Sequence, residues 1–427
     1  MHREAEVGAT AGTAGTPPSR LRRLARLLGP GLIAGAADDD PTAIGTYAQA
    51  GAMTGYGLLW TTLLTLPMMI VAQFTAAKVA IVERAGLSAT LMKYYPRPLV
   101  YAAVLGLLAA NLVNAGADLG AIAAAVNLIV PLPISLLVAP ITLAILLFLI
   151  LGSYHLIVNS FKWLTLALLA YVIASVLAGP AWGAVLRGTF VPHVETNAAF
   201  LGLLIATLGG NLSPYLFFWE ADLEVEELQA QPSVRPRRAV GRAARDTVIG
   251  MLVSNSIIYF IEIATAATLF AAGNHHVGSA AEAARALRPL LGNAAELLWA
   301  VGMIGSGLLA VPALTGSIAD AVAALFGWRR GLDQPPRRAA RFYLLLGGAM
   351  LLGMLFNFLG INPIRALVLS AVLNGFLSPP LLLLLVRLAG NREVMGDQVN
   401  GRWLTLGGWA TIVIMTLAAL GLLVTLL

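Results

Sequence analysis

The chain has 427 residues, of which 59% are hydrophobic and only 11% are charged, and its mean hydropathy is +0.82. Soluble globular domains carry about 25% charged residues, so this composition excludes an ordinary soluble protein and predicts an integral membrane protein. The formal net charge is +6 and the chain has no cysteine, which excludes disulfide frameworks, zinc–thiolate sites and cysteine nucleophiles.

Residues 1–26 contain no apolar signal-peptide core, and we expect a disordered cytoplasmic tail there. Residues 27–427 are expected to form a single polytopic domain, because apolar stretches of about 20 residues recur along them. The predicted fold class is an all-α integral membrane protein with eleven transmembrane helices. The predicted spans are 29–53, 56–82, 99–130, 134–152, 161–180, 198–222, 246–271, 296–325, 340–360, 363–387 and 403–427.

The distribution of arginine and lysine predicts the orientation of these spans. Nearly all basic residues fall in alternate loops, beginning with the N-terminal tail, and the other loops hold only Arg187, Arg285, Arg288 and Arg365. The positive-inside rule then predicts a multi-pass protein of the cell inner (plasma) membrane, with its N-terminus cytoplasmic and its C-terminus outside. The lipid bilayer is the expected environment, and neither a nucleic acid nor an obligate protein partner is expected.

Two of the spans carry residues that interrupt helices. The first span contains "ADDDPTAIG" and the sixth contains "LGGNLSPYLFF". Proline removes a backbone donor and clashes with the preceding helical turn, so we predict helix breaks at Pro41 and Thr42 and at Pro214. The alternative is that both prolines only kink continuous helices.

Two interrupted helices that lie five spans apart are typical of transporters built from inverted repeats, with a binding site near the middle of the membrane. Residues 29–180 would form the first repeat, residues 198–387 the second, and residues 403–427 an additional helix.

The three aspartates before Pro41 are the clearest functional signal. Carboxylates inside a bilayer are costly, and they usually face a cavity, pair with another group or mark an ion path. Aspartate oxygens, freed backbone carbonyls and retained waters are ligands that hard divalent cations prefer. Asp40, beside the expected break, is therefore the first choice as a metal ligand, and Asp38 and Asp39 are candidates for supporting positions.

The sixth span is expected to form the opposite wall of this metal site. Gly210 can offer its backbone carbonyl without a Cβ in the way, and Asn211 and Ser213 add neutral oxygens. For Ser213 the alternative is a hydrogen bond back to its own helical turn.

The third span reads "NLVNAGADLGAIAAAVN", which places Asn111, Asn114 and Asp118 close to one helical face. Such a polar stripe suits an ion path or proton relay, and it equally suits a network of interhelical hydrogen bonds. Glu262 and Asp320 are further candidates for buried groups with a role in transport.

These motifs resemble the Nramp family of divalent metal transporters. The segment "GPGLIAGAADDDPTAIGTYAQAGAMTGYGLLW" resembles the first span of that family with its Asp-Pro-Gly-Asn metal motif, and "GGNLSPYLFFW" stands where the family has Ala-x-x-Met-Pro-His. "VLSAVLN" and "NREVMGDQVNG" resemble the tenth span and the loop after it. The resemblance covers most of residues 29–427. It implies a LeuT-type 5+5 inverted repeat with broken helices 1 and 6, and alternating access.

The resemblance also implies a metal site with altered ligands. The metal-binding Asp of the family is kept as Asp40, while its Asn ligand falls on Ala43, its Met ligand on Ser213 and its Ala carbonyl on Gly210. This pattern resembles the Nramp-related magnesium transporter branch. A thioether selects softer transition metals, so a hydroxyl in its place removes that preference, and small side chains leave room for the waters that Mg²⁺ retains.

The groups that the family uses near its proton path are altered as well. The family's His falls on Tyr215, and its acid pair in the third span falls on Asn114 and Ala117, with Asp118 one place later. We therefore expect a secondary transporter for divalent metal cations, taking up Mg²⁺ and/or Mn²⁺ with weak or no proton coupling. No resident cofactor is expected, because the cation is the cargo.

Several other functions remain open. The main alternative is a proton-coupled Mn²⁺ or Fe²⁺ importer of the conventional Nramp type, in which Asp118 or Glu262 replaces the missing relay. An organic-solute symporter is less favoured, because three aspartates make a poor wall for a substrate carboxylate. An intramembrane aspartyl hydrolase would need two carboxylates close together, such as Asp40 and Asp118, and neither it nor a purely structural role is favoured. We therefore expect no enzyme activity.

Overall fold

The computed structural model describes residues 34–35, 37–151, 170–230, 235–285, 292, 295–332 and 334–426. These residues contain helices and no strand, and they include eight segments that are long and apolar enough to cross a membrane, together with a shorter apolar helix. The prediction of an all-α, multi-pass membrane protein is confirmed. The predicted tail, residues 1–26, and much of the predicted span 161–180 lie outside the described residues.

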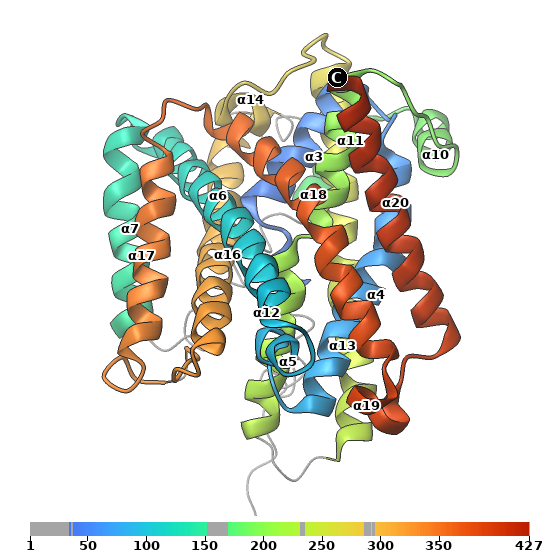
Figure 1. The fold of residues 1–427 in the computed structure, drawn as a ribbon. Coiled ribbons are helices and arrows are strands. Elements are labelled where there is room, and N and C mark those ends of the chain that lie inside the picture. Colours follow the sequence, from blue (N-terminus) through green and yellow to red (C-terminus); the bar gives the residue numbers. More distant parts are fainter. Residues whose placement is uncertain are drawn as a thin grey trace, which may run out of the picture.

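The helices follow one another around the bundle shown in Figure 1. The helices of the first half are α3 (Pro41–Thr54), α4 (Leu59–Glu83), α5 (Leu87–Tyr94), α6 (Arg97–Ile129), α7 (Ile134–Leu151), α9 (Ala170–Leu177) and α10 (Trp182–Phe190). Those of the second half are α11 (Ala198–Asn211), α12 (Pro214–Ala230), α13 (Pro236–Thr265), α14 (Ala280–Ala284), α16 (Ala295–Leu325), α17 (Ala340–Phe356), α18 (Pro363–Gly390), α19 (Arg392–Met395) and α20 (Arg402–Leu426).

Most predicted spans agree with these helices to within a few residues, and α13 is the main exception. It begins at Pro236, ten residues before the predicted start at 246. The extra turns carry several arginines, so they lack the hydropathy by which a span is recognised. Proline suits the first position of a helix, where its missing N–H is not needed.

Both predicted helix breaks are present. The first span is interrupted at Asp39 and Asp40, and α3 then starts with Pro41. The sixth span is interrupted at Leu212 and Ser213, and α12 then starts with Pro214. In both places proline is the first residue of the second half-helix, where it costs no hydrogen bond.

Proline alone does not break a helix in this chain. Pro67, Pro140 and Pro312 lie inside the continuous helices α4, α7 and α16, and α18 contains two further prolines. In the two broken spans polar residues and glycine accompany the proline, but α18 carries a similar Asn-Gly-Phe-Leu-Ser-Pro run and stays helical, so these residues permit a break without imposing one. The alternative that Pro41 and Pro214 only kink their helices is excluded by the two observed breaks.

The broken sixth span runs through the middle of the bundle. In Figure 1, α11 occupies the upper half and α12 the lower half, and α18 crosses close to both. Gly209 of α11 meets α18 so closely that a Cβ there would collide with the Ala371 carbonyl and the Gly375 amide. Small residues that let helix backbones approach are typical of packing in membranes.

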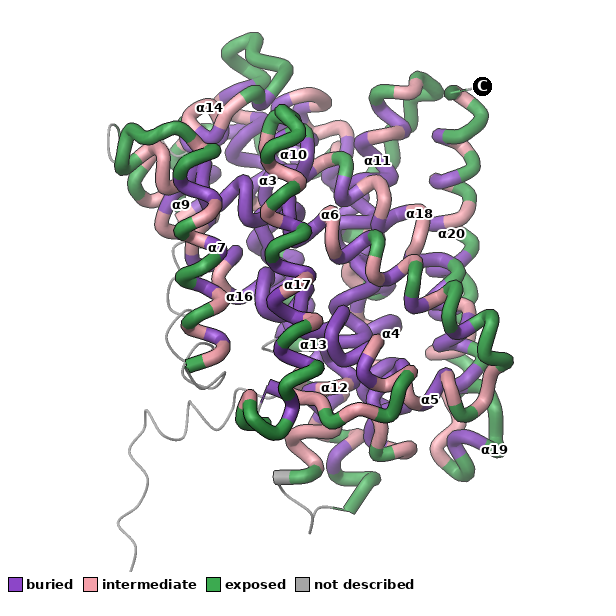
Figure 2. The backbone as a smooth tube through the Cα atoms, turned by 60° about the vertical axis from the view of Figure 1, so that its left-hand side comes forward, coloured by how far each residue is buried: buried purple, intermediate pink, exposed green. Residues whose placement is uncertain are grey.

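The outer surface of the bundle suits lipid. Figure 2 shows buried residues through the centre and exposed residues at the two ends and along the outward faces. On α20 the exposed side chains include Trp403, Leu406, Leu417 and Val424. An apolar surface of this kind is expected where a helix faces lipid tails.

The loops are distributed between the two ends as the charge pattern predicts. Figure 1 places α5, α19 and the connection from α16 to α17 at the lower end, and places α10, α14 and the C-terminus at the upper end. The lower connections carry most of the basic residues. That this lower end is cytoplasmic stays a prediction.

The close crossing of α11 and α18 can be tested with Gly209→Ala. The added methyl group should force the two helices apart, and overpacking of this kind typically costs about 1–3 kcal/mol, so the thermal midpoint of the detergent-solubilised protein should fall. The control is Gly348→Ala in α17, where a Cβ would meet nothing within 4 Å and helix propensity improves. Equal melting of the two variants in a scanning fluorescence assay would contradict the crossing.

Candidate functional site

Asp40 is the side chain on which the candidate site is centred. Its backbone is extended (φ −71°, ψ 165°), and its Oδ1 accepts a hydrogen bond of 2.7 Å from the Ala43 amide, which makes it the N-cap of α3. Its Oδ2 accepts hydrogen bonds from Asn114 Nδ2 at 3.3 Å and from the Tyr215 hydroxyl at 3.1 Å. The residue is almost completely buried, so these donors replace water around a carboxylate.

The two helix breaks face one another. The Tyr215 hydroxyl, one residue into α12, also donates to the Ala37 carbonyl at 2.8 Å on the other side of the first break. A Cβ built on Gly210 would lie 3.8 Å from Ala43 Cα. The prediction that the breaks meet is confirmed, and the wall opposite Asp40 contains Gly210 and Tyr215.

A polar chain connects Asp40 with the third span. The Thr42 hydroxyl contacts Asn114 Oδ1 and also lies 2.9 Å from Asp118 Oδ1. Asp118 is fully buried, and its Oδ2 has no hydrogen-bond partner among the described residues. Thr42, expected only as part of the helix break, therefore links the candidate relay residues Asn114 and Asp118 to the metal-site candidate Asp40.

Three polar residues of α18 hydrogen-bond to the second break and to Asn114, and none of the three was predicted from the sequence. Ser370 donates to Asn114 Oδ1 at 2.9 Å, Asn374 Nδ2 donates to Ser213 Oγ at 3.1 Å, and the Ser378 hydroxyl donates to the Leu212 carbonyl. The three α18 residues are spaced by four, so they share one face. That spacing, inside an otherwise apolar span, is the signal that could have revealed them.

Ser213 makes the hydrogen bond to its own turn that had been the alternative. Its hydroxyl lies 3.0 Å from the carbonyl oxygens of both Gly209 and Gly210. Two acceptors thus share one hydroxyl proton, while Asn374 donates to the Ser213 oxygen. The hydroxyl and the Gly210 carbonyl lie together at the break, and a ligand to either would compete with this bond.

Asp38 and Asp39 lie on a different side of the first span from Asp40. The Ser254 hydroxyl of α13 contacts both, with 3.0 Å to Asp39 Oδ1. Asp38 ends the first half-helix, whereas Asp39 and Asp40 lie in the break, and Asp40 is extended. In this structure Asp39, a predicted metal-site residue, contacts α13 instead of the second break.

Three other predicted residues also point away from Asp40. Asn211 donates to Thr65 Oγ1 of α4 at 2.8 Å, and Asn111 donates to Ser317 Oγ of α16 at 2.7 Å. Glu262 of α13 is fully buried, and neither carboxylate oxygen has a hydrogen-bond partner within the described part of the chain. Asn111 and Asn211 therefore make interhelical hydrogen bonds, and Glu262 stands apart from the network around Asp40.

The charge of the site has no protein counterion within the described residues. No ion pair involves Asp38, Asp39 or Asp40 there, and no three His, Asp or Glu side chains of those residues converge to hold a metal. The groups around Asp40 are instead amide, hydroxyl and carbonyl. One carboxylate among neutral oxygens can bind a hard divalent cation that keeps part of its water shell.

Comparison with known proteins agrees with this geometry. The profile of the family described as "Nramp: Natural resistance-associated macrophage protein-like" matches residues 31–425. The chain is 31% identical over 428 residues to the "Divalent metal cation transporter MntH" of Deinococcus radiodurans, an alignment that covers 97% of this chain and 93% of that protein.

Two solved structures share the fold. One is the crystal structure of the Eremococcus coleocola manganese transporter in complex with an aromatic bis-isothiourea substituted compound, with a TM-score of 0.72, 20% identity, and coverage of 96% of this chain and 88% of that one. The other is the inward-facing conformation of Mhp1, with a TM-score of 0.51, 16% identity, and coverage of 93% of this chain and 89% of that one. The predicted LeuT-type fold with broken helices 1 and 6 is confirmed.

The contact between the two breaks can be tested with Tyr215→Phe. This change removes the hydroxyl that reaches Asp40 and Ala37, and loss of a buried hydrogen bond to a charged group costs about 1.5–3 kcal/mol, so the thermal midpoint should fall. The matched control is Tyr171→Phe, because the Tyr171 hydroxyl is equally buried but faces Trp299 instead of either helix break. If both variants melt at the wild-type temperature, the Tyr215 bridge does not stabilise the protein.

Proposed function

Because the chain belongs to the Nramp family of divalent metal transporters, we propose that it carries Mg²⁺ and/or Mn²⁺ across the membrane by alternating access, with weak or no proton coupling. The divalent cation is the cargo, and no resident cofactor takes part. Asp40 is the charged ligand. Water molecules and neutral oxygens from the two helix breaks complete the coordination.

The observation that carries this proposal is the position of Asp40. It lies buried where the two helix breaks meet and has no ion-paired partner among the described residues. Half-helix ends expose unpaired backbone groups, and in transporters of this kind they form the ion and substrate sites. A cation arriving at Asp40 would compensate a charge that the surrounding protein leaves unbalanced.

The preference for a hard cation rests on the donors present. The side chains that hydrogen-bond across the two breaks are Asp, Asn, Ser, Thr and Tyr. Ser213 stands where the family resemblance expects a thioether, and Ala43 where it expects an amide. Oxygen donors favour Mg²⁺ and Mn²⁺ over softer metals, and the small side chains leave space for retained water.

A proton-coupled Mn²⁺ or Fe²⁺ importer is the second candidate, and Asp118 is the observation that favours it. This buried carboxylate has one oxygen without a hydrogen-bond partner among the described residues, and Thr42 joins its other oxygen to the Asp40 network. It could accept a proton when a cation arrives. Against this role, Tyr215 and Asn114 replace groups that titrate more readily than a phenol or an amide.

The two candidates are separated by ion flux into proteoliposomes, measured for Mg²⁺, Mn²⁺ and Ca²⁺ with and without a pH gradient. The proposal expects Mg²⁺ and Mn²⁺ flux with little discrimination and no accompanying acidification. Exclusion of Mg²⁺, combined with Mn²⁺ accumulation driven by an inward proton gradient, would reject the proposal in favour of the conventional importer.

Asp40→Ala should abolish divalent cation flux while the protein stays folded, because it removes the charged ligand. Asp118→Asn should reduce flux less, since it acts on the connected network. The control is Asp397→Ala, which removes an exposed carboxylate in the segment after α18 and should leave flux unchanged. Substantial Mg²⁺ or Mn²⁺ flux through a well-folded Asp40→Ala protein would exclude this site.

Ser213→Met, alone or with Ala43→Asn, should shift selectivity towards Mn²⁺ and Cd²⁺ and depress Mg²⁺ flux. The change adds a thioether and fills space that ion-bound water would occupy. A contact worth about 1.4 kcal/mol changes relative affinity tenfold, which competition flux can resolve. Ser213→Ala is the control, because it removes the hydroxyl without adding a soft donor. An unchanged Mn²⁺/Mg²⁺ ratio in Ser213→Met would contradict the assignment of Ser213.

A further inference from the structure

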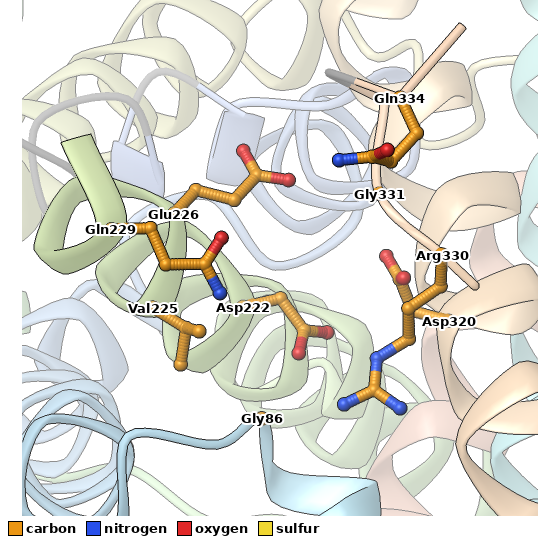
Figure 3. A pocket seen from close by; sticks show the side chains of 9 residues that line it. All are labelled: Gly86, Asp222, Val225, Glu226, Gln229, Asp320, Arg330, Gly331 and Gln334. Carbon is orange, nitrogen blue, oxygen red and sulfur yellow. The ribbon is translucent and has the colours of Figure 1, made fainter. Parts of the chain in front are cut away.

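A polar cavity lies between α12 and α16, at the end of the bundle that carries α5. Its volume is about 270 Å³, and it is lined by Gly86, Asp222, Val225, Glu226, Gln229, Asp320, Arg330, Gly331 and Gln334. Figure 3 shows the α12 residues on one side and Asp320, Arg330 and Gln334 on the other. None of these residues belongs to the hydrogen-bond network around Asp40.

The lining of this cavity carries an excess of negative charge. Asp222, Glu226 and Asp320 contribute three carboxylates, and Arg330 contributes one guanidinium, so the formal net charge is −2. The amides of Gln229 and Gln334 add neutral oxygen donors. The charge and the donors both match a divalent cation.

Asp320 shows that this cluster is more than a solvated acidic surface. Its side chain is only 6% exposed, although it lines the cavity, as Figure 3 shows. It makes no hydrogen bond and no ion pair within 4 Å to any residue that the structure describes, Arg330 included. Arg330 acts on Asp320 electrostatically, without a direct contact. A buried carboxylate that lacks a direct partner is costly, and a cation in the cavity would supply one.

Gly86 packs closely against the Asp222 carboxylate at the edge of the cavity. A Cβ on Gly86, the residue before α5, would collide with Asp222 Oδ1. Glycine at this position lets the carboxylate lie against the α5 end of the cavity. The carboxylates of Asp222 and Asp320 therefore approach the same space from different helices.

We propose that this cavity is a second divalent-cation site, which binds the ion with its water shell. No three His, Asp or Glu side chains of the described residues converge on a single point, so the carboxylates would contact the ion's waters. A water molecule occupies about 30 Å³ in the liquid, so the cavity can contain an ion with its first shell. Mg²⁺ loses water reluctantly and suits such a site.

An ion bound here would bridge α12 and α16. The helix α12 begins at the break of the sixth span, whereas α16 is continuous. A cation between them favours the arrangement in which α12 lies against α16, and by the same linkage that arrangement favours the cation. The site would thus respond to the divalent cation concentration at this end of the protein, which we expect to be cytosolic.

The test is Mn²⁺ and Mg²⁺ binding to the purified full chain, in an Asp40→Ala background that removes the proposed transport site. One binding event should remain in that background. Adding Asp320→Asn should weaken it at least about tenfold, the usual cost of losing a partner outside the inner coordination shell. Adding Arg330→Gln should strengthen it, because a competing positive charge is removed, and misfolding cannot produce a gain in affinity.

The control is Asp397→Asn, the same chemical change at an exposed position, which should leave binding unchanged. If the Asp40→Ala protein binds no cation, or if Asp320→Asn and Arg330→Gln both leave its affinity unchanged, there is no second site. The proposed function concerns the ion class and would fail in a different experiment: cation flux that persists in Asp40→Ala rejects the transport site, whatever the cavity binds.

Discussion

The hydrogen bond from the Ala43 amide to Asp40 is the interaction on which the rest of this structure depends. It caps α3, so it fixes the point at which the first span stops being helical. The positive end of α3 also stabilises the carboxylate charge. The Ala43 amide and the helix end thus offset part of the cost of burying this carboxylate, and its other oxygen is directed towards the second break.

The network around Asp40 joins four helices through single side chains. Asn114 of α6 receives Ser370 of α18 and donates to Asp40, while Asn374, one turn further along α18, donates to Ser213 at the other break. A displacement of the second break must therefore change hydrogen bonds to α18, and the first break is connected to α18 through Asn114. α18 therefore connects the two halves of the candidate site. Its mostly apolar sequence does not indicate this role.

The two breaks were predicted correctly from the three aspartates before Pro41 and the Gly-Gly-Asn run before Pro214, although α18 stays helical through a similar run before Pro379. The sequence was not sufficient to predict which neighbour each polar side chain would meet. Asn211 and Ser213 are two residues apart, yet Asn211 contacts α4 and Ser213 contacts α18. Such choices depend on how helices that are distant in the chain pack together, as the pairing of Asp39 with Ser254 also shows.

The three adjacent aspartates contact two different parts of the structure. Asp38 and Asp39 share the single hydroxyl proton of Ser254, whereas Asp40 accepts hydrogen bonds from the Ala43 amide, from Asn114 and from Tyr215, whose proton is shared with the Ala37 carbonyl. Asp40 is thus the best stabilised as an anion, and the other two are left with little compensation on the α13 side. A cation approaching Asp40 also reduces the repulsion from these neighbours, because their charges lie within a low-dielectric interior. Under the proposed function, Asp40 coordinates the ion directly, while Asp38 and Asp39 lie close enough to contribute to the electrostatic field at that point.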